Sequence, residues 1–392
     1  MFPRQSWYSA TDRSQMNPSR KKHSASAPEI GQLLVIGFDG TEMSPRLADL
    51  LTRVQPGGVI LFARNIVNAT QTHALLKECQ AWVRKPLFTC VDLEGGRVDR
   101  FRNVLGSTPS AADVFLSGYP KLFRQHGEII GRACRLLGFN VDFAPVLDLA
   151  FEASRGVMSS RAFSADPKQV VSYARGFLAG LHSAGVIGAG KHFPGLGEGD
   201  LDSHNDLPVI DKPFRELWQA DLVPYCVMKR ELPMVLVNHA NYPAVTGERL
   251  PASLSKKWIT DILRRRIGYR GLVASDDLEM GGVLKAAPID KAAAEFIRAG
   301  GDLCLICHLQ EYVERAFETM SREHERDSRF RERVVQSLKR VAQFKRKHAA
   351  GLRISPSPSV EKVERLSRRL WEFSEHVRLQ ALSAAAAAGA RE

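Results

Sequence analysis

The chain has 392 residues, of which 44% are hydrophobic, and a formal net charge of +12. This apolar content suffices for a large core, and no apolar run approaches the roughly 20 residues of a membrane span. The positive charge gathers at the ends, since residues 1–30 hold five Lys and Arg against two acids and residues 309–392 hold 18 against 12. The near-balanced middle predicts no basic binding groove, and the tails lack the interleaved aromatics of a nucleic-acid-binding protein.

Residues 1–29 are predicted to be a disordered basic tail, because they are polar and rich in Ser, Arg and Lys. They lack the 7–15-residue apolar core of a secretory signal. The six cysteines are scattered, as reduced thiols are in cytoplasmic proteins. Cys304-Leu-Ile-Cys307-His308 matches a haem-attachment pattern, but it lies in an apolar run that is typical of a buried strand. We therefore expect a cytoplasmic protein with no haem and no membrane partner.

Eight apolar runs have the length and composition of buried strands. They are Gln32–Gly40, Gly58–Asn65, Leu87–Asp92, Val141–Asp148, Val186–Lys191, Met234–His239, Gly271–Asp276 and Asp302–Cys307. Amphipathic segments alternate with them: Ser44–Val54, Thr70–Val83, Ala112–Leu137, a helix that begins at Asp166-Pro167, another that opens at Asp211-Lys-Pro213, and Ser255–Gly268. Such alternation indicates parallel strands, and eight of them close a (β/α)8 TIM-type barrel of the α/β class.

An open doubly wound sheet is the alternative. The polar residues favour the barrel, because they follow the carboxyl ends of several strands, where barrel enzymes build their sites. These residues are Asp39, Asn65, Asp92, Asp148, Lys191, His192, His239 and Asp276. We expect the barrel domain to span residues 30–350. Residues 351–392 are predicted to be a linker and a C-terminal helix, Val360–Leu382, whose apolar residues Leu366, Leu370, Trp371 and Phe373 dock on the barrel.

Four sequence motifs occur together and in order. They are Val91-Asp-Leu-Glu-Gly-Gly-Arg-Val-Asp-Arg100, Arg161-Ala-Phe163, Lys191-His-Phe-Pro-Gly195 with Asp202-Ser-His204, and Ser275-Asp-Asp-Leu-Glu-Met280. Over about residues 30–310 this closely resembles glycoside hydrolase family 3, the bacterial single-domain β-N-acetylhexosaminidases. The resemblance implies a retaining hydrolase that removes terminal β-linked N-acetylglucosamine from a small saccharide or muropeptide derived from peptidoglycan. It implies neither cofactor nor metal, and we expect a monomer.

The resemblance also implies the roles of single residues. Asp276 would be the nucleophile, and His204 the acid/base with Asp202 as its partner. Sugar-binding positions carry over to Asp92, Arg100, Arg161, Lys191 and His192.

The chemistry of these residue types agrees with such roles. A covalent glycosyl-enzyme needs a carboxylate on a rigid element, which Asp276 at a strand's end provides. Asp277 is the alternative nucleophile, and strand alternation lets only one of the two face the site. Arg100 and Arg161 could equally form structural salt bridges, with Glu94 as a partner. Four further polar residues are interpreted as structural: Asp39, Asp142, Asp148 and His239.

The chain departs from the family pattern in the loop that carries His204. It has Leu196 where the family has histidine, and Glu198-Gly199 where the family has an acid and threonine. We expect this loop to be ordered differently and activity to survive. Three alternatives stay open: a family-3 phosphorylase, since histidine repels an incoming phosphate less than a carboxylate would; a β-glucosidase-type enzyme of other sugar specificity; and a catalytically impaired sugar-binding protein.

Overall fold

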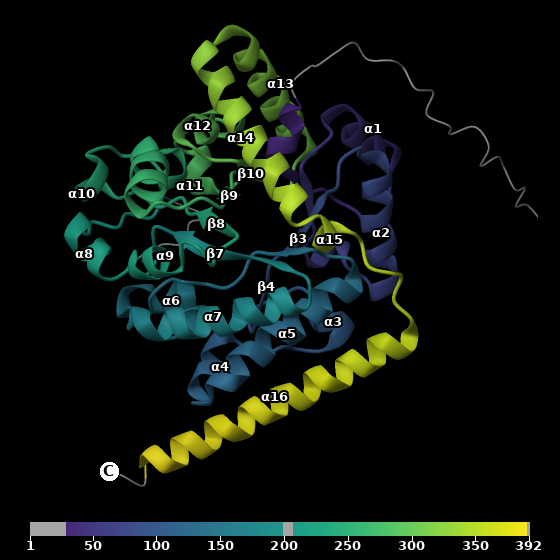
Figure 1. Ribbon diagram of the computed structural model, residues 1–392, viewed down its shortest axis with the longest axis vertical. Coiled ribbons are helices and arrows are strands. Elements are labelled where there is room, and N and C mark those ends of the chain that lie inside the picture. Colours follow the sequence, from purple (N-terminus) through teal and green to yellow (C-terminus); the bar gives the residue numbers. More distant parts are fainter. Residues whose placement is uncertain (1–28, 199–206, 390–392) are drawn as a thin grey trace, which may run out of the picture.

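The computed structural model describes residues 29–198 and 207–389. At its centre is a closed barrel with the strand order β1-β10-β9-β8-β7-β6-β3-β2, in which all neighbours are parallel (Figure 1). The strands are β1 (Leu34–Ile36), β2 (Gly58–Ile60), β3 (Phe88–Val91), β6 (Val141–Asp142), β7 (Ile187–Phe193), β8 (Met234–Val237), β9 (Leu272–Asp277) and β10 (Leu303–Ile306). Each overlaps one predicted apolar run. The predicted barrel is confirmed, and the open sheet is excluded.

The helices that follow successive strands cover the outside of the barrel. They are α1 (Pro45–Val54), α2 (Ala69–Trp82), α5 (Pro120–Leu137), α7 (Pro167–Ser183), α8 (Phe214–Gln219), α9 (Val223–Met228), η6 (Lys257–Ile267), α12 (Ile289–Ala299), α13 (Gln310–Arg326) and α14 (Ser328–Lys347). Shorter helices occupy the loops: α3 (Arg102–Leu105), α4 (Ala111–Leu116), α6 (Arg155–Met158), α10 (Pro243–Thr246), α11 (Gly281–Leu284) and α15 (Ala349–Leu352). A separate antiparallel hairpin pairs β4 (Leu93–Gly95) with β5 (Val98–Asp99).

Local chemistry explains where several helices begin. Ser44 caps α1 by accepting the Leu47 N–H at 3.1 Å, and Asp166 caps α7 by accepting the Lys168 N–H at 2.8 Å. The predicted helix Ala112–Leu137 is instead two helices, α4 and α5. Gly118 lies between them at φ +72°, and Pro120 begins α5, because the residue before a proline is disfavoured in helical geometry.

The helix that Asp211-Lys-Pro213 was predicted to open is likewise two, α8 and α9. Pro224 stands in the first turn of α9, where the lack of an N–H costs nothing.

Helix α14 crosses the end of the barrel at which the strands begin (Figure 1). Its Lys345 is only 6% exposed and packs 4.7 Å above the centre of the Phe88 ring. The Lys345 ammonium donates to Gln32 Oε1 at 2.9 Å and to the Gly57 carbonyl at 2.8 Å, just before β1 and β2. The described part of the chain places no carboxylate within ion-pair distance of it.

The C-terminal helix α16 (Val360–Gly389) lies against α3, α4 and α5 and extends past them (Figure 1). Its buried side chains are Leu366, Leu370, Phe373 and Val377. Trp371, expected on the same face, is 64% exposed, so it belongs to the opposite side of the helix. The helix also continues past the predicted end at Leu382, because alanine, which follows, is the best helix former.

Some of the predictions concern residues outside the described ranges. The predicted disordered tail lies almost wholly in residues 1–28, outside the described residues, as do Asp202 and His204. In the remainder of the chain, no helix combines the length and the apolar character required to cross a membrane.

Candidate active site

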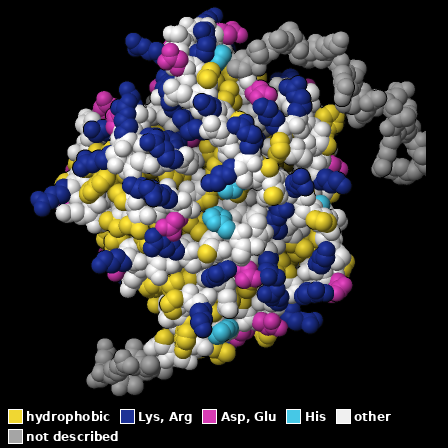
Figure 2. Space-filling view, viewed as in Figure 1, with side chains coloured by type: hydrophobic (Ala, Val, Ile, Leu, Met, Phe, Trp, Pro, Cys, Tyr) yellow, Lys and Arg dark blue, Asp and Glu magenta, His cyan; other side chains and the backbone are white. Residues whose placement is uncertain are grey.

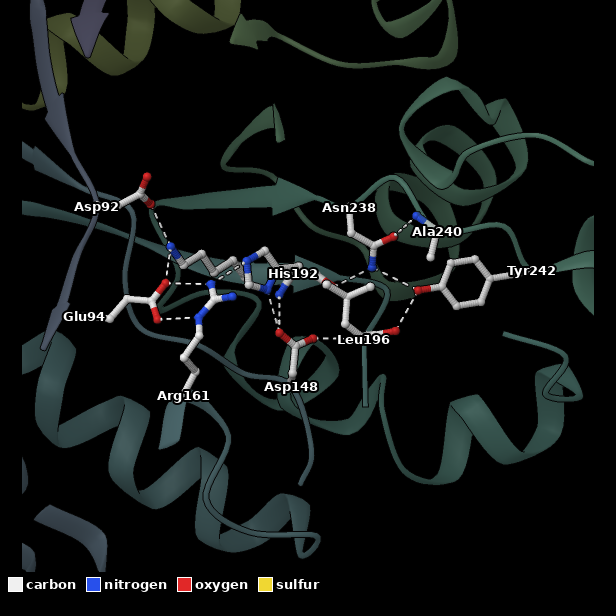
Figure 3. A network of polar contacts seen from close by, with 11 residues as sticks. Asp92, Glu94, Asp148, Arg161, His192, Leu196, Asn238, Ala240 and Tyr242 are labelled. Carbon is white, nitrogen blue, oxygen red and sulfur yellow. Dashed lines mark hydrogen bonds and ion pairs between the residues drawn. The ribbon is translucent and has the colours of Figure 1, made fainter. Parts of the chain in front are cut away.

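Five residues at the end of the barrel where the strands finish form one polar network, which we call the rim cluster (Figure 3). Its members are Asp92, Glu94, Arg161, Lys191 and His192. Asp92 follows β3, Glu94 lies in β4, Arg161 ends the short helix η4 (Ser159–Arg161), and the other two lie in β7. Four of these five were predicted to bind sugar, and the structure brings those four together.

Lys191 and His192 are neighbours, so a regular strand would direct them to opposite faces. The register between β7 and β8 shifts between Gly190 and Phe193, which marks a local irregularity of the strand. Both side chains reach the rim cluster: Lys191 contacts Asp92, and His192 contacts Arg161. The irregular strand end therefore supplies two functional groups from adjacent positions.

Two cations share Glu94. Lys191 Nζ lies 2.6 Å from Glu94 Oε1 and 2.7 Å from Asp92 Oδ1. Arg161 donates to both oxygens of Glu94 at 2.8 Å, a bidentate pair. Because the Glu94 and Lys191 side chains are 5% and 3% exposed, the pairing is what makes their burial tolerable. The expectation that Glu94 is an arginine partner is met by Arg161.

These contacts fix the charge states of the rim cluster. Burial alone would raise the pKa of Glu94, but the charges of Arg161 and Lys191 outweigh it and lower that pKa. Burial alone would lower the pKa of Lys191, and Asp92 and Glu94 raise it instead. Asp92 is 20% exposed, and its Oδ2 accepts no hydrogen bond from a described residue. Asp92 is therefore the carboxylate of the cluster that is free to accept a ligand hydroxyl.

Asp148 orients His192. Its Oδ2 lies 2.6 Å from His192 Nδ1, while its Oδ1 accepts the Leu196 N–H at 2.7 Å. His192 Nε2 lies 3.2 Å from Arg161 Nη2, which can only donate. The Nδ1 atom of His192 therefore faces Asp148, and its Nε2 faces Arg161. Asp148, which the sequence reasoning treated as structural, holds the ring and the start of the following loop together.

The structure separates Asp276 from Asp277. Relative to β10, the register of β9 shifts between Ala274 and Asp277, so an extra residue lies at this strand end. Asp277 turns to His308, whose Nε2 lies 3.1 Å from Asp277 Oδ2. Asp276 forms no ion pair with a described residue, and its Oδ1 accepts only the Asp277 N–H at 2.9 Å.

The surroundings of Asp276 favour its ionised form. Burial alone would raise its pKa, but the influence of nearby His192, His239 and Lys191 outweighs burial and lowers that pKa. His239 is held by Ser253 Oγ at 2.7 Å and by the Asp277 carbonyl at 2.9 Å. Asp276 is therefore an ionised carboxylate, without a salt-bridge partner among the described residues, at the end of a rigid strand.

Arg100 stands apart from the rim cluster. Its guanidinium carbon lies 5.5 Å from the centre of the Phe62 ring, and its Nε is buried without an acceptor. His308 stacks on the same Phe62 ring, with 5.4 Å between the ring centres. Arg100 has no ion-pair partner among the described residues, so a structural salt bridge does not explain it.

The loop that leads toward residue 199 is anchored by groups that sequence reasoning missed. Tyr242 donates its hydroxyl to the Gly195 carbonyl at 2.6 Å, and Lys212 pairs with Glu198 at 3.0 Å and with Asp221 at 2.9 Å. Gly195 has φ +136°, a conformation that favours glycine. No sequence pattern identifies Tyr242 or Lys212, because both depend on contacts across the fold.

Leu196 occupies a buried position in this anchored segment, with 9% of its surface exposed. Its side chain joins the hydrophobic core, so an apolar residue here is accommodated by packing. The departure from histidine therefore leaves the described start of the loop well held, through the Leu196 N–H and Glu198.

A sequence model described as the Glycosyl hydrolase family 3 N terminal domain matches residues 27–343. A protein named Beta-hexosaminidase from Alkalilimnicola ehrlichii is 39% identical over 288 residues, which cover 71% of this chain and 82% of that protein. Another of the same name, from Bordetella avium, is 35% identical over 297 residues, with coverages of 74% and 84%.

Among solved structures, a family 3 β-N-acetylglucosaminidase from Paenibacillus sp. is similar, with a TM-score of 0.80 and 30% identity. The match covers 88% of this chain and 68% of that protein. Sequence and structure comparisons thus point to the same family.

Proposed function

The chain belongs to glycosyl hydrolase family 3, and from that premise we propose that it is a retaining exo-glycosidase that removes terminal β-linked N-acetylglucosamine. One observation carries the proposal: Asp276 is an ionised strand-end carboxylate beside a cluster of fixed polar groups. The relatives named Beta-hexosaminidase and the β-N-acetylglucosaminidase structure support the choice of sugar.

The proposed roles follow from the contacts. Asp92, with a free oxygen, accepts a sugar hydroxyl, while Lys191 supports Asp92 and Arg161 is held in place by Glu94. Arg100, with its unpaired Nε, donates to the ligand from the side of Phe62. His192, whose ring is oriented by Asp148, contacts the sugar from another side. Charged and oriented donors of this kind suit a polyhydroxylated ring.

The reaction proceeds in two displacements. Asp276 attacks the anomeric carbon, a glycosyl ester forms, and the bond to the leaving oxygen breaks as that oxygen takes a proton from His204. Water then attacks the ester, gives its proton to His204, and releases the sugar and free Asp276. Asp202 stabilises the imidazolium of His204, as a carboxylate does in a catalytic triad. Asp202 and His204 lie outside the described residues, so their part in this proposal rests on the sequence motif.

We extend the proposal to peptidoglycan-derived substrates and to a cytoplasmic, monomeric enzyme. The six cysteines support the cytoplasmic location, because all of them are free, as is usual in a reducing environment. We also propose that the barrel domain spans residues 30–350 and that residues 351–392 form the linker and the terminal helix.

The direct test compares 4-nitrophenyl β-glycosides of N-acetylglucosamine and glucose, each with and without phosphate, and identifies the product anomer by proton NMR. We expect preferential release of N-acetylglucosamine, first as the β anomer, at a rate independent of phosphate. A sugar 1-phosphate product would indicate a phosphorylase. Faster cleavage of the glucoside would indicate another specificity, and binding without any release would indicate a sugar-binding protein.

A further inference from the structure

A large cavity opens at the end of the barrel opposite the rim cluster. Its volume is about 950 Å³. Pro233 and Gly271, in its lining, directly precede β8 and β9, so the cavity lies where the strands begin. The remaining walls come from the second half of α7, the last turns of α14, and the segments that lead into β8 and β9. A ligand here could not contact the groups at the opposite rim.

The cavity is lined by many cations and few acids. Six Lys and Arg residues line it, and Glu231 is the one carboxylate in the described lining. Arg175 pairs with Glu231 at 2.7 Å, whereas the side chains of Arg230, Arg270 and Lys347 form no hydrogen bond or ion pair with any described residue. Figure 2 shows this face of the molecule, on which Lys and Arg side chains outnumber the acidic ones.

A second cavity of about 470 Å³ shares Arg270 and Arg340 with the first, so the two adjoin. It adds Arg264, Arg265 and Arg333. Arg264 and Arg340 both pair with Asp302, and one carboxylate therefore serves two guanidinium groups.

The surroundings of Arg333, within the described residues, are also rich in positive charge. Its Nε is buried without an acceptor. Burial, together with neighbouring Arg340, lowers its pKa. The pair of cavities thus holds several cations in excess of the carboxylates that face them, an arrangement that a multivalent anion would relieve.

The first cavity also has an apolar part. Leu178 and Leu232 line it, and Phe344 and His348 stack with 4.3 Å between ring centres. Such a surface accommodates a flat ring beside the charged groups. A volume of this size exceeds what a single phosphate needs and lies within the range of small-molecule sites.

We propose that the adjoining cavities bind a small molecule with two or more linked phosphates, such as a nucleoside polyphosphate. Linked phosphates match the cations, which spread over both cavities and therefore need more than one anionic group. Arginine forks suit phosphate oxygens in particular. The inference concerns a site separate from the proposed catalytic one, so it stands or falls independently of the glycosidase activity.

The test measures binding of inorganic tripolyphosphate and of ATP to the full chain by isothermal titration calorimetry. The variant Arg270→Glu/Lys347→Glu reverses two exposed, unpaired charges of the cavity. The control Lys77→Glu/Arg368→Glu reverses two exposed charges elsewhere and leaves the same net charge. Far-UV circular dichroism and thermal unfolding verify that each variant is folded.

We expect one tripolyphosphate per chain, weakened at least about tenfold in the cavity variant and by less than about twofold in the control. Equal affinities for ATP and tripolyphosphate would show that phosphates suffice, and tighter ATP binding would show that the ring surface also contributes; both support the proposal. Absence of binding, or equal losses in both variants, would overturn it. So would binding of a single-stranded oligonucleotide when neither small probe binds.

Discussion

Replacing Lys345 by Met should make the stability of the protein less dependent on pH. Burial lowers the pKa of Lys345 from 10.5 to about 7, and neighbouring Lys85 adds to the effect. The unfolded chain therefore binds more protons than the folded chain between pH 7 and about 10.5. Stability from this group rises with pH across that window, and its full penalty is felt below pH 7.

The pKa difference sets the size of the effect. Each pKa unit corresponds to about 1.4 kcal/mol, so the charged Lys345 destabilises the acidic folded state by about 5 kcal/mol. Methionine removes that penalty but leaves Gln32 Oε1 without its donor, which costs about 1–3 kcal/mol. Gly57 O keeps a hydrogen bond from the Phe88 N–H. Lys345→Met should therefore be more stable than the wild type at pH 6.

The assay is equilibrium urea unfolding followed by tryptophan fluorescence at pH 6, 7, 8 and 9. Between pH 7 and 9 the wild type should gain about 2 kcal/mol relative to Lys345→Met. Taking the difference between the two proteins cancels groups common to both. Lys339→Met, an exposed change in the same helix, serves as the control and should show no such trend. If the difference in unfolding free energy between wild type and variant stays constant from pH 6 to 9, burial does not lower the pKa of Lys345 as stated.

Four further outcomes are expected. Asp276→Ala should lower kcat by at least about 10³-fold while thermal unfolding stays near the wild type, since the group lies at the rim; normal turnover would assign the nucleophile elsewhere. His204→Ala should slow poor leaving groups by about 10²–10⁴-fold and a dinitrophenyl glycoside much less, and equal slowing would make His204 a binding residue. Deleting residues 1–28 should leave activity and melting temperature nearly unchanged, which calorimetry can contradict. Asp142→Asn should shift the melting temperature by less than about 3 °C at pH 7, because burial raises the pKa of Asp142 well above its usual range and its protonated form resembles the amide; a larger fall would show that the charge is needed.

The sequence predicted the barrel well, because its main signals are local. Asp166-Pro167 marks a helix start through a cap and a fixed φ, and short apolar runs bounded by polar residues mark buried parallel strands. The two split helices were missed, since Gly118-Tyr-Pro120 and Pro224 break the chain inside patterns that remain amphipathic.

The residues of the site could be predicted from the sequence, but the contacts between them could not. Motif and strand-end position placed Asp92, Arg161, Lys191 and His192 at one rim. That Glu94 is shared by two cations depends on distances across three elements, which no spacing encodes.

Charge counted along the chain also missed the basic cavities. Arg270 comes from the loop before β9 and Arg340 and Lys347 from α14, so their convergence appears only in three dimensions, where it replaces the expectation that no basic groove exists.

Covalent trapping measures most directly whether Asp276 is the nucleophile. The protein is incubated with a 2-deoxy-2-fluoro glycosyl substrate whose glycosyl-enzyme hydrolyses slowly, and the adduct is mapped by peptide mass spectrometry. We expect one glycosyl group per chain, attached to Asp276. Attachment to Asp277 or Glu279, or turnover to the inverted anomer without an adduct, would contradict it.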